Sequence, residues 1–295
     1  MSRLYCLNSF VTNYLDMPEV VKHPYHEASP LVFLRGGGCL LARLLVLKLG
    51  GSLVTEKRRG GAVREEALRR LGSELAAVDR PLIIVHGGGG RVHEVAGEYQ
   101  VALGRGAPRG LEGFIRTSIE TRRLNLQVTE ILADAGLRCI GLPSTPIYQT
   151  RRGRIATAGL DPILAALDQG LTPVLNGDVV FDREIGFTVL SGDAVAVDLS
   201  LRLGAERLVF ATDVDGIFEH PGEGARLLSS VDKRTLASVR FGDVGDVTGG
   251  MASKVEEALR AAEGGVEVYV VNGLVPSRVV AALLGRETIG TRILG

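Results

Sequence analysis

Short apolar runs of strand length alternate with helix-like stretches along most of the chain, from residue 44 onward. Several of the strand-like runs are rich in Val and Ile and are nearly unbroken by polar residues, which is typical of strands buried on both faces. In the helix-like stretches the apolar residues recur with a spacing near 3.6. We therefore predict strands at 44–49, 81–86, 138–142, 172–175, 207–212 and 267–272, and helices at 64–78, 92–103, 117–135, 156–169, 194–203 and 254–263.

This alternation predicts an α/β fold in which helices cover both faces of a mainly parallel sheet. The stretch 177–190 has a different pattern, because polar Asp182-Arg183-Glu184 separates two apolar runs. We predict that it forms a β-hairpin beside the main sheet.

Residues 1–43 lack sustained periodicity, contain Pro18, Pro24 and Pro30, and end in a run of three glycines. We interpret them as an N-terminal extension outside the core. A disordered arm, an ordered strap and a start codon placed too early all remain open.

Composition excludes several classes of protein. The 295 residues carry 34 acidic and 34 basic side chains, so no overall field favours nucleic acid or an anionic membrane. The three cysteines are widely spaced and fit neither a disulfide framework nor a zinc site. No apolar run approaches the roughly 20 residues of a membrane span, and no signal peptide is evident. We therefore expect a cytoplasmic protein without nucleic-acid or membrane partners.

Only five of the 34 basic residues are lysine, and Lys48, Lys57 and Lys254 lie in or just beyond glycine-rich turns. A lysine ammonium is a compact, mobile point charge that suits phosphate, whereas arginine presents a planar fork. The placement of these lysines indicates phosphate chemistry.

Two predicted strands run directly into glycine. The strand at 44–49 is followed by Gly50-Gly51-Ser52, and the strand at 81–86 by four glycines, 87–90. Backbone without Cβ atoms lets N–H groups approach an anion closely. Neither turn has the spacing of a P-loop or of a dinucleotide fingerprint, so these two enzyme classes are disfavoured.

Two further loops add charge. Thr248-Gly249-Gly250-Met251 leads into a helix that carries Lys254 near its start, where a bound anion would offset the helix dipole. The strand at 207–212 is followed by Asp213 and Asp215, which can orient a lysine or Mg²⁺. Together the four loops predict phosphoryl transfer. If the acceptor is itself a phosphate, its oxygen is already anionic near neutral pH, because the second pKa is about 6, and no general base is needed.

From Leu44 to its C-terminus the chain resembles the amino acid kinase superfamily, and within it most closely the isopentenyl phosphate kinases. The resemblance is carried by Lys48-Leu49-Gly50-Gly51-Ser52, His86-Gly87-Gly88-Gly89 with His93, Gly177-Asp178, Ser191-Gly192-Asp193, Thr212-Asp213-Val214-Asp215-Gly216, and Thr248-Gly249-Gly250-Met251 with Lys254. It implies a three-layer αβα sandwich with a mainly parallel central sheet, usually dimeric, with an acceptor-binding lobe (44–185) and an ATP-binding lobe (186–295).

The resemblance also implies roles for individual residues. The implied ATP-binding residues are Lys48, Gly50, Gly51, Ser52, Gly89, Asp213, Gly250 and Lys254; the acceptor-binding residues are Gly88, His93, Gly177 and Asp178; the catalytic residues are Lys48, Lys57, His93 and Lys254. The implied reaction uses ATP with Mg²⁺ and phosphorylates isopentenyl phosphate or a similar small alkyl monophosphate. No protein side chain is assigned as a metal ligand.

The sequence departs from the family pattern beside the predicted acceptor site. The family usually has Gly-Gly-Gly-Ser-Phe-Gly-His, whereas this chain has Gly90-Arg91-Val92 before His93, and Asn176 replaces a common Tyr before Gly177. These changes leave the identity of the organic tail of the acceptor open. Two alternatives also remain: a superfamily kinase for an amino acid, a nucleotide or a phosphonate, and a non-catalytic protein that binds anions or nucleotides.

Overall fold

The computed structural model describes residues 43–56, 61–220, 222, 224–236, 239 and 250–295, all of which belong to one compact unit, Leu31–Gly295. Nearly all of the predicted extension, 1–43, lies outside the described residues, as does Lys57.

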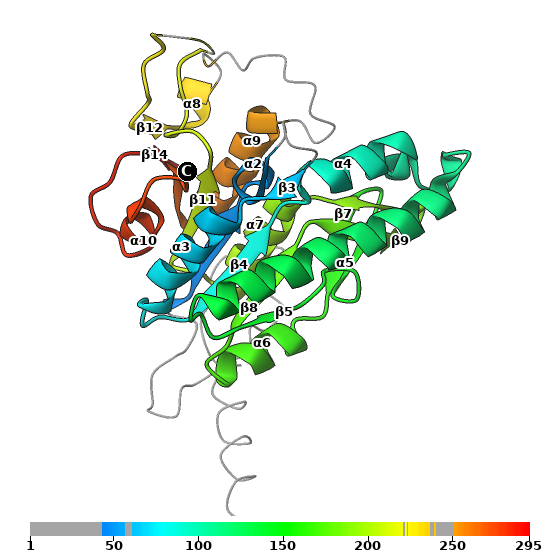
Figure 1. Cartoon of the computed structure of the whole chain (residues 1–295). Helices are drawn as coiled ribbons and strands as arrows, with labels where there is room; N and C mark the ends of the chain where they lie inside the picture. The colour runs from blue at the N-terminus through cyan, green and yellow to red at the C-terminus, as the bar shows by residue number, and fades with distance from the viewer. Residues whose placement is uncertain (1–42, 57–60, 221, 223, 237–238, 240–249) are drawn as a thin grey trace, which may run out of the picture. The chain divides into compact units, whose positions relative to one another are not determined.

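An eight-stranded, mainly parallel sheet forms the centre of this unit (Figure 1). Its spatial order is β12 (Ser230–Val231), β14 (Thr291–Ile293), β13 (Glu267–Asn272), β11 (Arg207–Thr212), β1 (Leu45–Leu49), β4 (Leu82–His86), β8 (Thr172–Asn176) and β5 (Cys139–Gly141). Neighbouring strands are parallel except for β13 and β14, which pair antiparallel. All six predicted strands are present with nearly the predicted bounds.

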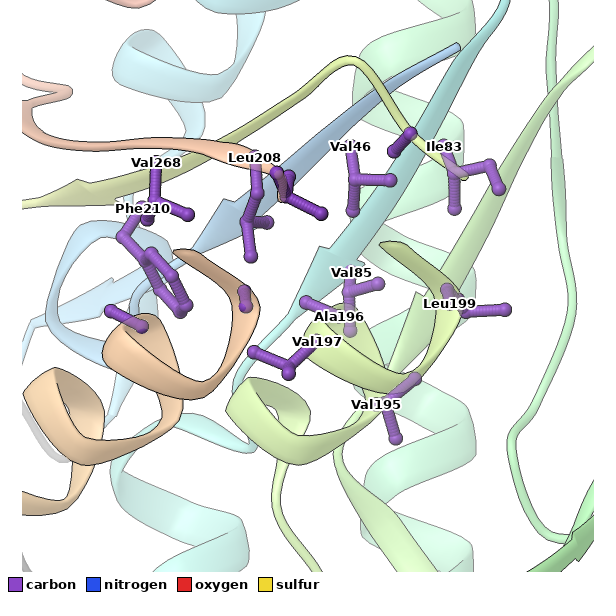
Figure 2. Packing of buried hydrophobic residues seen from close by; sticks show 14 of the residues in the cluster. Val46, Ile83, Val85, Val195, Ala196, Val197, Leu199, Leu208, Phe210 and Val268 are labelled. Carbon is purple, nitrogen blue, oxygen red and sulfur yellow. The ribbon is translucent and has the colours of Figure 1, made fainter. Parts of the chain in front are cut away.

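Helices lie on both faces of the sheet because successive strand residues point to opposite sides. In β1, Val46 packs in a core cluster with residues of α7 (Gly192–Leu203) and α9 (Gly250–Glu263). Figure 2 shows strand side chains such as Val46, Leu208 and Phe210 facing these helices. Leu45 and Leu47 point the other way and pack with residues of α3 (Glu65–Ala76), α5 (Gly110–Asp134) and α10 (Arg278–Leu283). This arrangement is the predicted three-layer αβα sandwich.

Smaller elements complete the fold. A four-stranded sheet has the order β10 (Gly186–Leu190), β9 (Asp178–Asp182), β6 (Tyr148–Arg151) and β7 (Arg154–Ala158), and β2 (Thr55–Glu56) pairs with β3 (Ala62–Val63). The remaining helices are α2 (Gly51–Val54), α4 (Gly89–Glu98), the 3₁₀ helix η3 (Val101–Gly106), α6 (Asp161–Asp168) and α8 (Lys233–Leu236). The predicted hairpin at 177–190 is confirmed, because β9 and β10 pair antiparallel.

The helix predicted at 156–169 was wrong in its first part. Residues up to Ala158 form strand β7, which pairs antiparallel with β6, and the helix starts only at Asp161. Pro162 fits this start, since proline is tolerated in the first turn of a helix, where its missing N–H would have no partner within the helix.

Other helix boundaries also differ from the prediction, and two of them have a clear physical reason. Helix α4 ends at Glu98, and shortly beyond it Gln100 has φ of +50°, a left-handed conformation that breaks the helical path. Helix α5 begins at Gly110, seven residues earlier than predicted. Gly113 lies in this added part, and a Cβ there would come within 2.2 Å of Tyr99 Cβ. Close packing against Tyr99 therefore requires glycine at position 113, and glycine weakens the helical pattern in the sequence.

Candidate active site

A cavity of about 710 Å³ lies where strands β1, β4 and β11 end and β9 begins. Ligand sites of open parallel sheets occur at this carboxyl edge. Of the residues predicted for the site, eleven line the cavity: Lys48, Gly50, Gly51, Ser52, Gly88, Gly89, His93, Gly177, Asp178, Asp213 and Lys254. Gly250 is the first residue of α9, and the next residue of that helix, Met251, lines the cavity.

Glycine is required here because backbone segments pack against each other at the strand ends. A Cβ on Gly177 would lie 2.7 Å from the backbone nitrogen of Gly192. Gly89 has φ of +65°, and a Cβ on it would lie 2.7 Å from the Thr55 side chain. The glycine runs thus bring the chain segments that form the cavity wall into direct contact.

We expect Gly177→Ala to lower the melting temperature by several degrees, because relieving the contact with Gly192 costs about 1–3 kcal/mol. Gly159→Ala is the matched control, since a Cβ at Gly159 has nothing within 4 Å. Thermal unfolding of both variants checks this. Equal melting temperatures for the two would contradict the close packing.

Two lysines share one carboxylate at the centre of the cavity. Lys48 Nζ lies 2.8 Å from Asp193 Oδ1, and Lys254 Nζ lies 3.1 Å from both Asp193 oxygens. All three belong to different elements: Lys48 to β1, Lys254 to α9 and Asp193 to the first turn of α7. Ser191 caps α7 by accepting a hydrogen bond from the Ala194 amide, and the positive end of the helix dipole favours Asp193 there.

Burial sets the charge state of this group. The pKa of Lys48 is lowered to about 8: desolvation is the largest cause, Asp193 opposes it, and the nearby Lys254 adds to the lowering. Burial alone would raise the pKa of Asp193, but the two ammonium groups outweigh it and hold the pKa well below its usual range. Below pH 8 the group carries two positive charges and one negative charge. Its net charge of about +1 in a partly desolvated cavity attracts an anion.

The first glycine turn is held by hydroxyl groups. Ser52 Oγ donates to Asp213 Oδ1 at 2.7 Å, which joins α2 to the end of β11. Thr55 Oγ1 lies 3.2 Å from the Gly51 carbonyl and accepts from the Gly90 amide at 3.0 Å. Thr55 therefore fixes the spacing between the first and second glycine turns.

On the other side of the cavity, Asp178 is buried and fully engaged. Thr121 Oγ1 donates to its Oδ1 at 2.7 Å, Thr145 Oγ1 lies 2.6 Å from its Oδ2, and the Val179 amide donates to Oδ1. His93 lies in the second turn of α4, where its Nε2 is 3.9 Å from the position of a Cβ on Gly88. The imidazole thus faces back toward the second glycine turn.

His86, the last residue of β4, has a structural role. Its Nδ1 donates to the Gly87 carbonyl at 2.9 Å, and its Nε2 lies 3.1 Å from Asn125 Nδ2. Complete burial lowers the pKa of His86 to about 4. The ring is therefore neutral at pH 7, and its Nε2 accepts a hydrogen bond from Asn125 Nδ2.

Sequence reasoning missed three residues of this site. Asp193 was part of a recognised motif but received no role, although its position directly after a strand and before a helix was a usable signal. Thr55 and Thr121 gave no signal, because isolated threonines are common and only the fold brings them to Gly90 and Asp178.

Within the described part of the chain, no cluster of three or more His, Cys, Asp or Glu side chains could hold a metal ion. No helix among the same residues is long and apolar enough to cross a membrane. The carboxylates of the cavity are engaged: Asp193 with two lysines, Asp213 with Ser52 and Asp178 with two threonines.

Over most of its length the chain is similar to members of a known family. The profile of the amino acid kinase family matches residues 43–272. Isopentenyl phosphate kinase from Methanothermobacter thermautotrophicus is 37% identical over 266 residues, covering 85% of this chain and 99% of that protein. The chain belongs to the isopentenyl phosphate kinase family.

Further members of the isopentenyl phosphate kinase family agree with this assignment. The Arabidopsis thaliana isopentenyl phosphate kinase is 32% identical, covering 73% of this chain and 71% of that protein. An X-ray structure of an isopentenyl phosphate kinase superposes with a TM-score of 0.74 at 35% identity, covering 85% of this chain and all of the other. The predicted amino acid kinase fold is confirmed.

Proposed function

We propose that this protein is a kinase that transfers the γ-phosphoryl group of ATP to isopentenyl phosphate and so forms isopentenyl diphosphate. The observation that carries the proposal is the pair Lys48 and Lys254 around Asp193, in a glycine-walled cavity of a chain from this family. The rival superfamily kinases receive less support, because the relatives at 37% and 32% identity are both isopentenyl phosphate kinases. A non-catalytic binding role does not require two buried lysines converging on one carboxylate.

In the proposed reaction an oxygen of the acceptor phosphate attacks the γ-phosphorus of ATP. A new P–O bond forms while the bond from the γ-phosphorus to the bridging oxygen breaks, and ADP leaves with that electron pair. The attacking oxygen is already anionic near neutral pH, so no proton has to be removed. Catalysis then consists of positioning and of stabilising the negative charge that develops on the transferring group.

We assign ATP phosphate contacts to Lys48, Lys254 and the glycine turns at 50–52 and 89, with Asp213 and Gly250 on the nucleotide side. Asp193 touches no phosphate in this scheme and acts by holding the two ammonium groups in place. Lys57 is assigned to the moving γ-phosphoryl group from its sequence position alone. Mg²⁺ is expected to arrive with the nucleotide, because oxygen ligands of ATP suit it and the described carboxylates are engaged.

The acceptor phosphate is assigned to Gly88 and His93, with Gly177 and Asp178 closing that side of the cavity. We keep the proposed acceptor-binding lobe, 44–185, and ATP-binding lobe, 186–295, with Lys48 and the glycine turns of the first lobe reaching the ATP phosphates across the cavity. A homodimer is part of the proposal. It is supported by an exposed apolar stripe on α5, formed by Leu111, Ile115, Ile119 and Leu126, because such stripes mark association surfaces.

The test of the acceptor assignment is His93→Ala. A histidine that faces the glycine turn can donate a hydrogen bond to a phosphate oxygen. We expect the KM for isopentenyl phosphate to rise, or kcat to fall, by about tenfold or more, which corresponds to about 1.4 kcal/mol. Steady-state kinetics and ATP binding by calorimetry measure the two effects separately.

ATP binding without acceptor should stay within about twofold in His93→Ala, and His93→Gln, which keeps a donor, should recover part of the loss. Normal turnover of isopentenyl phosphate by His93→Ala would remove this residue from the acceptor site. An equal loss of ATP binding would show that its role is structural.

A further inference from the structure

One face of helix α5 carries polar residues where buried apolar residues are usual. Thr117, Thr121 and Asn125 are four residues apart, so they lie above one another on the same face, and all three are buried. Asn125 Nδ2 donates to the Val174 carbonyl at 3.0 Å and lies beside His86, while Thr121 donates to Asp178. Two members of this polar row therefore have partners at the edge of the sheet.

Thr117 differs from the other two. Its side chain is only 1% exposed, and its Oγ1 has no hydrogen-bond partner among the described residues. An unpaired buried hydroxyl is destabilising, and nearly all such groups in folded proteins are satisfied. Thr117 and Thr121 both line the cavity described above, so the missing partner of Thr117 can be a bound molecule.

The position of Thr117 indicates which part of a bound acceptor it would contact. Along α5, Asn125 reaches the end of β4, Thr121 reaches Asp178, and Thr117 lies one further turn, about 5.4 Å, away from the sheet. On α4, Ala96 likewise lies about one turn beyond His93, and Ala96 also lines the cavity.

Part of the cavity wall is apolar. Ala96 and Phe187 belong to a small hydrophobic cluster, and Val189, which packs against it, lines the cavity as Ala96 does. An acceptor whose phosphate is held at Gly88 and His93 would place its organic part along this wall. A pure hydrocarbon tail there would leave the hydroxyl of Thr117 unpaired.

We propose that Thr117 determines acceptor specificity by hydrogen bonding to a hydroxyl group on the organic part of the acceptor, so that the site takes hydroxyalkyl monophosphates in addition to isopentenyl phosphate. This inference rests on the proposed function, since it assumes the same acceptor phosphate position and the same transfer. The reaction is unchanged: the phosphate oxygen attacks the γ-phosphorus of ATP, ADP leaves, and the distal hydroxyl takes no part in bond making.

The test compares isopentenyl phosphate with 3-hydroxy-3-methylbutyl phosphate, which differs from it by one molecule of water added across the double bond. We expect the wild type to phosphorylate both. In Thr117→Val, which keeps the shape and removes the hydroxyl, kcat/KM for the hydroxylated acceptor should fall by about tenfold or more, while kcat/KM for isopentenyl phosphate should rise. Thr117→Ser should keep most of the wild-type preference.

Thr129→Val is the matched control, because Thr129 lies on the same helix, bonds the Asn125 carbonyl and does not line the cavity. Its preference between the two acceptors should equal that of the wild type. An equal loss for both acceptors in Thr117→Val, or a wild type that phosphorylates isopentenyl phosphate alone, would overturn the assignment of Thr117. A wild type that phosphorylates neither acceptor would overturn the proposed function, and this inference with it.

Discussion

Lys48→Met is expected to lower kcat by about 10³-fold, the largest effect of any single substitution considered. Lys48 is 5% exposed and bound to Asp193, so its charge acts in a desolvated cavity, where a preorganised cation stabilises developing phosphoryl charge most strongly. Methionine keeps most of the length and volume of the side chain, which separates loss of charge from loss of packing. A coupled assay for ADP release with isopentenyl phosphate measures the effect.

Lys233→Met serves as the control for this substitution. Lys233 is largely exposed on α8 and does not line the cavity, so its replacement should leave kcat within about twofold of the wild type. A Lys48→Met variant that is folded and keeps more than a tenth of the wild-type kcat would contradict the role of Lys48.

Asp193→Asn is expected to lower kcat by about 10²-fold, although Asp193 touches no substrate in the proposed scheme. Asparagine keeps the shape but removes the charge that holds the two ammonium groups together. Removing the charge of Asp193 also changes the pKa of Lys48, because Asp193 raises that pKa against the effect of burial. Without it the pKa of Lys48 should fall below its wild-type value of about 8.

The pH profile distinguishes this positioning role from a general loss of stability. In the wild type, kcat/KM for ATP should fall as pH rises through about 8, because Lys48 then loses its proton in the free enzyme. In Asp193→Asn this alkaline limb should move to lower pH. An unchanged limb, or one at higher pH, would show that Asp193 does not set the charge state of Lys48. Circular dichroism would confirm that the variant is folded.

The sequence was sufficient to predict the core of the fold because the strands are buried on both faces. Runs such as 207–212 and 267–272 contain mainly β-branched and other apolar residues, and this pattern depends little on tertiary contacts. The strand at 154–158 was missed because it is short, contains two alanines, which do not favour strands, and belongs to a peripheral sheet. Such a segment has no strong strand signal, and pairing with β6 decides its structure.

The same distinction applies to the site. Glycine turns at strand ends were visible in the sequence, because backbone that must approach an anion or another strand end excludes side chains. The contact between Lys48 and Asp193, which are 145 residues apart, was not visible, since only the fold brings β1 and α7 together. Thr117 could not have been singled out either. Its significance depends on burial, on the cavity and on the lack of a described partner.

The central claim is phosphoryl transfer from ATP to the phosphate of isopentenyl phosphate, and phosphorus NMR of a single reaction mixture tests it most directly. With purified protein, MgATP and isopentenyl phosphate, the resonance of the monophosphate should disappear while the coupled resonances of a diphosphate ester and of ADP appear in equal amounts. If ATP stays intact, or if it is hydrolysed to ADP and inorganic phosphate while isopentenyl phosphate is unchanged, the proposed function is wrong.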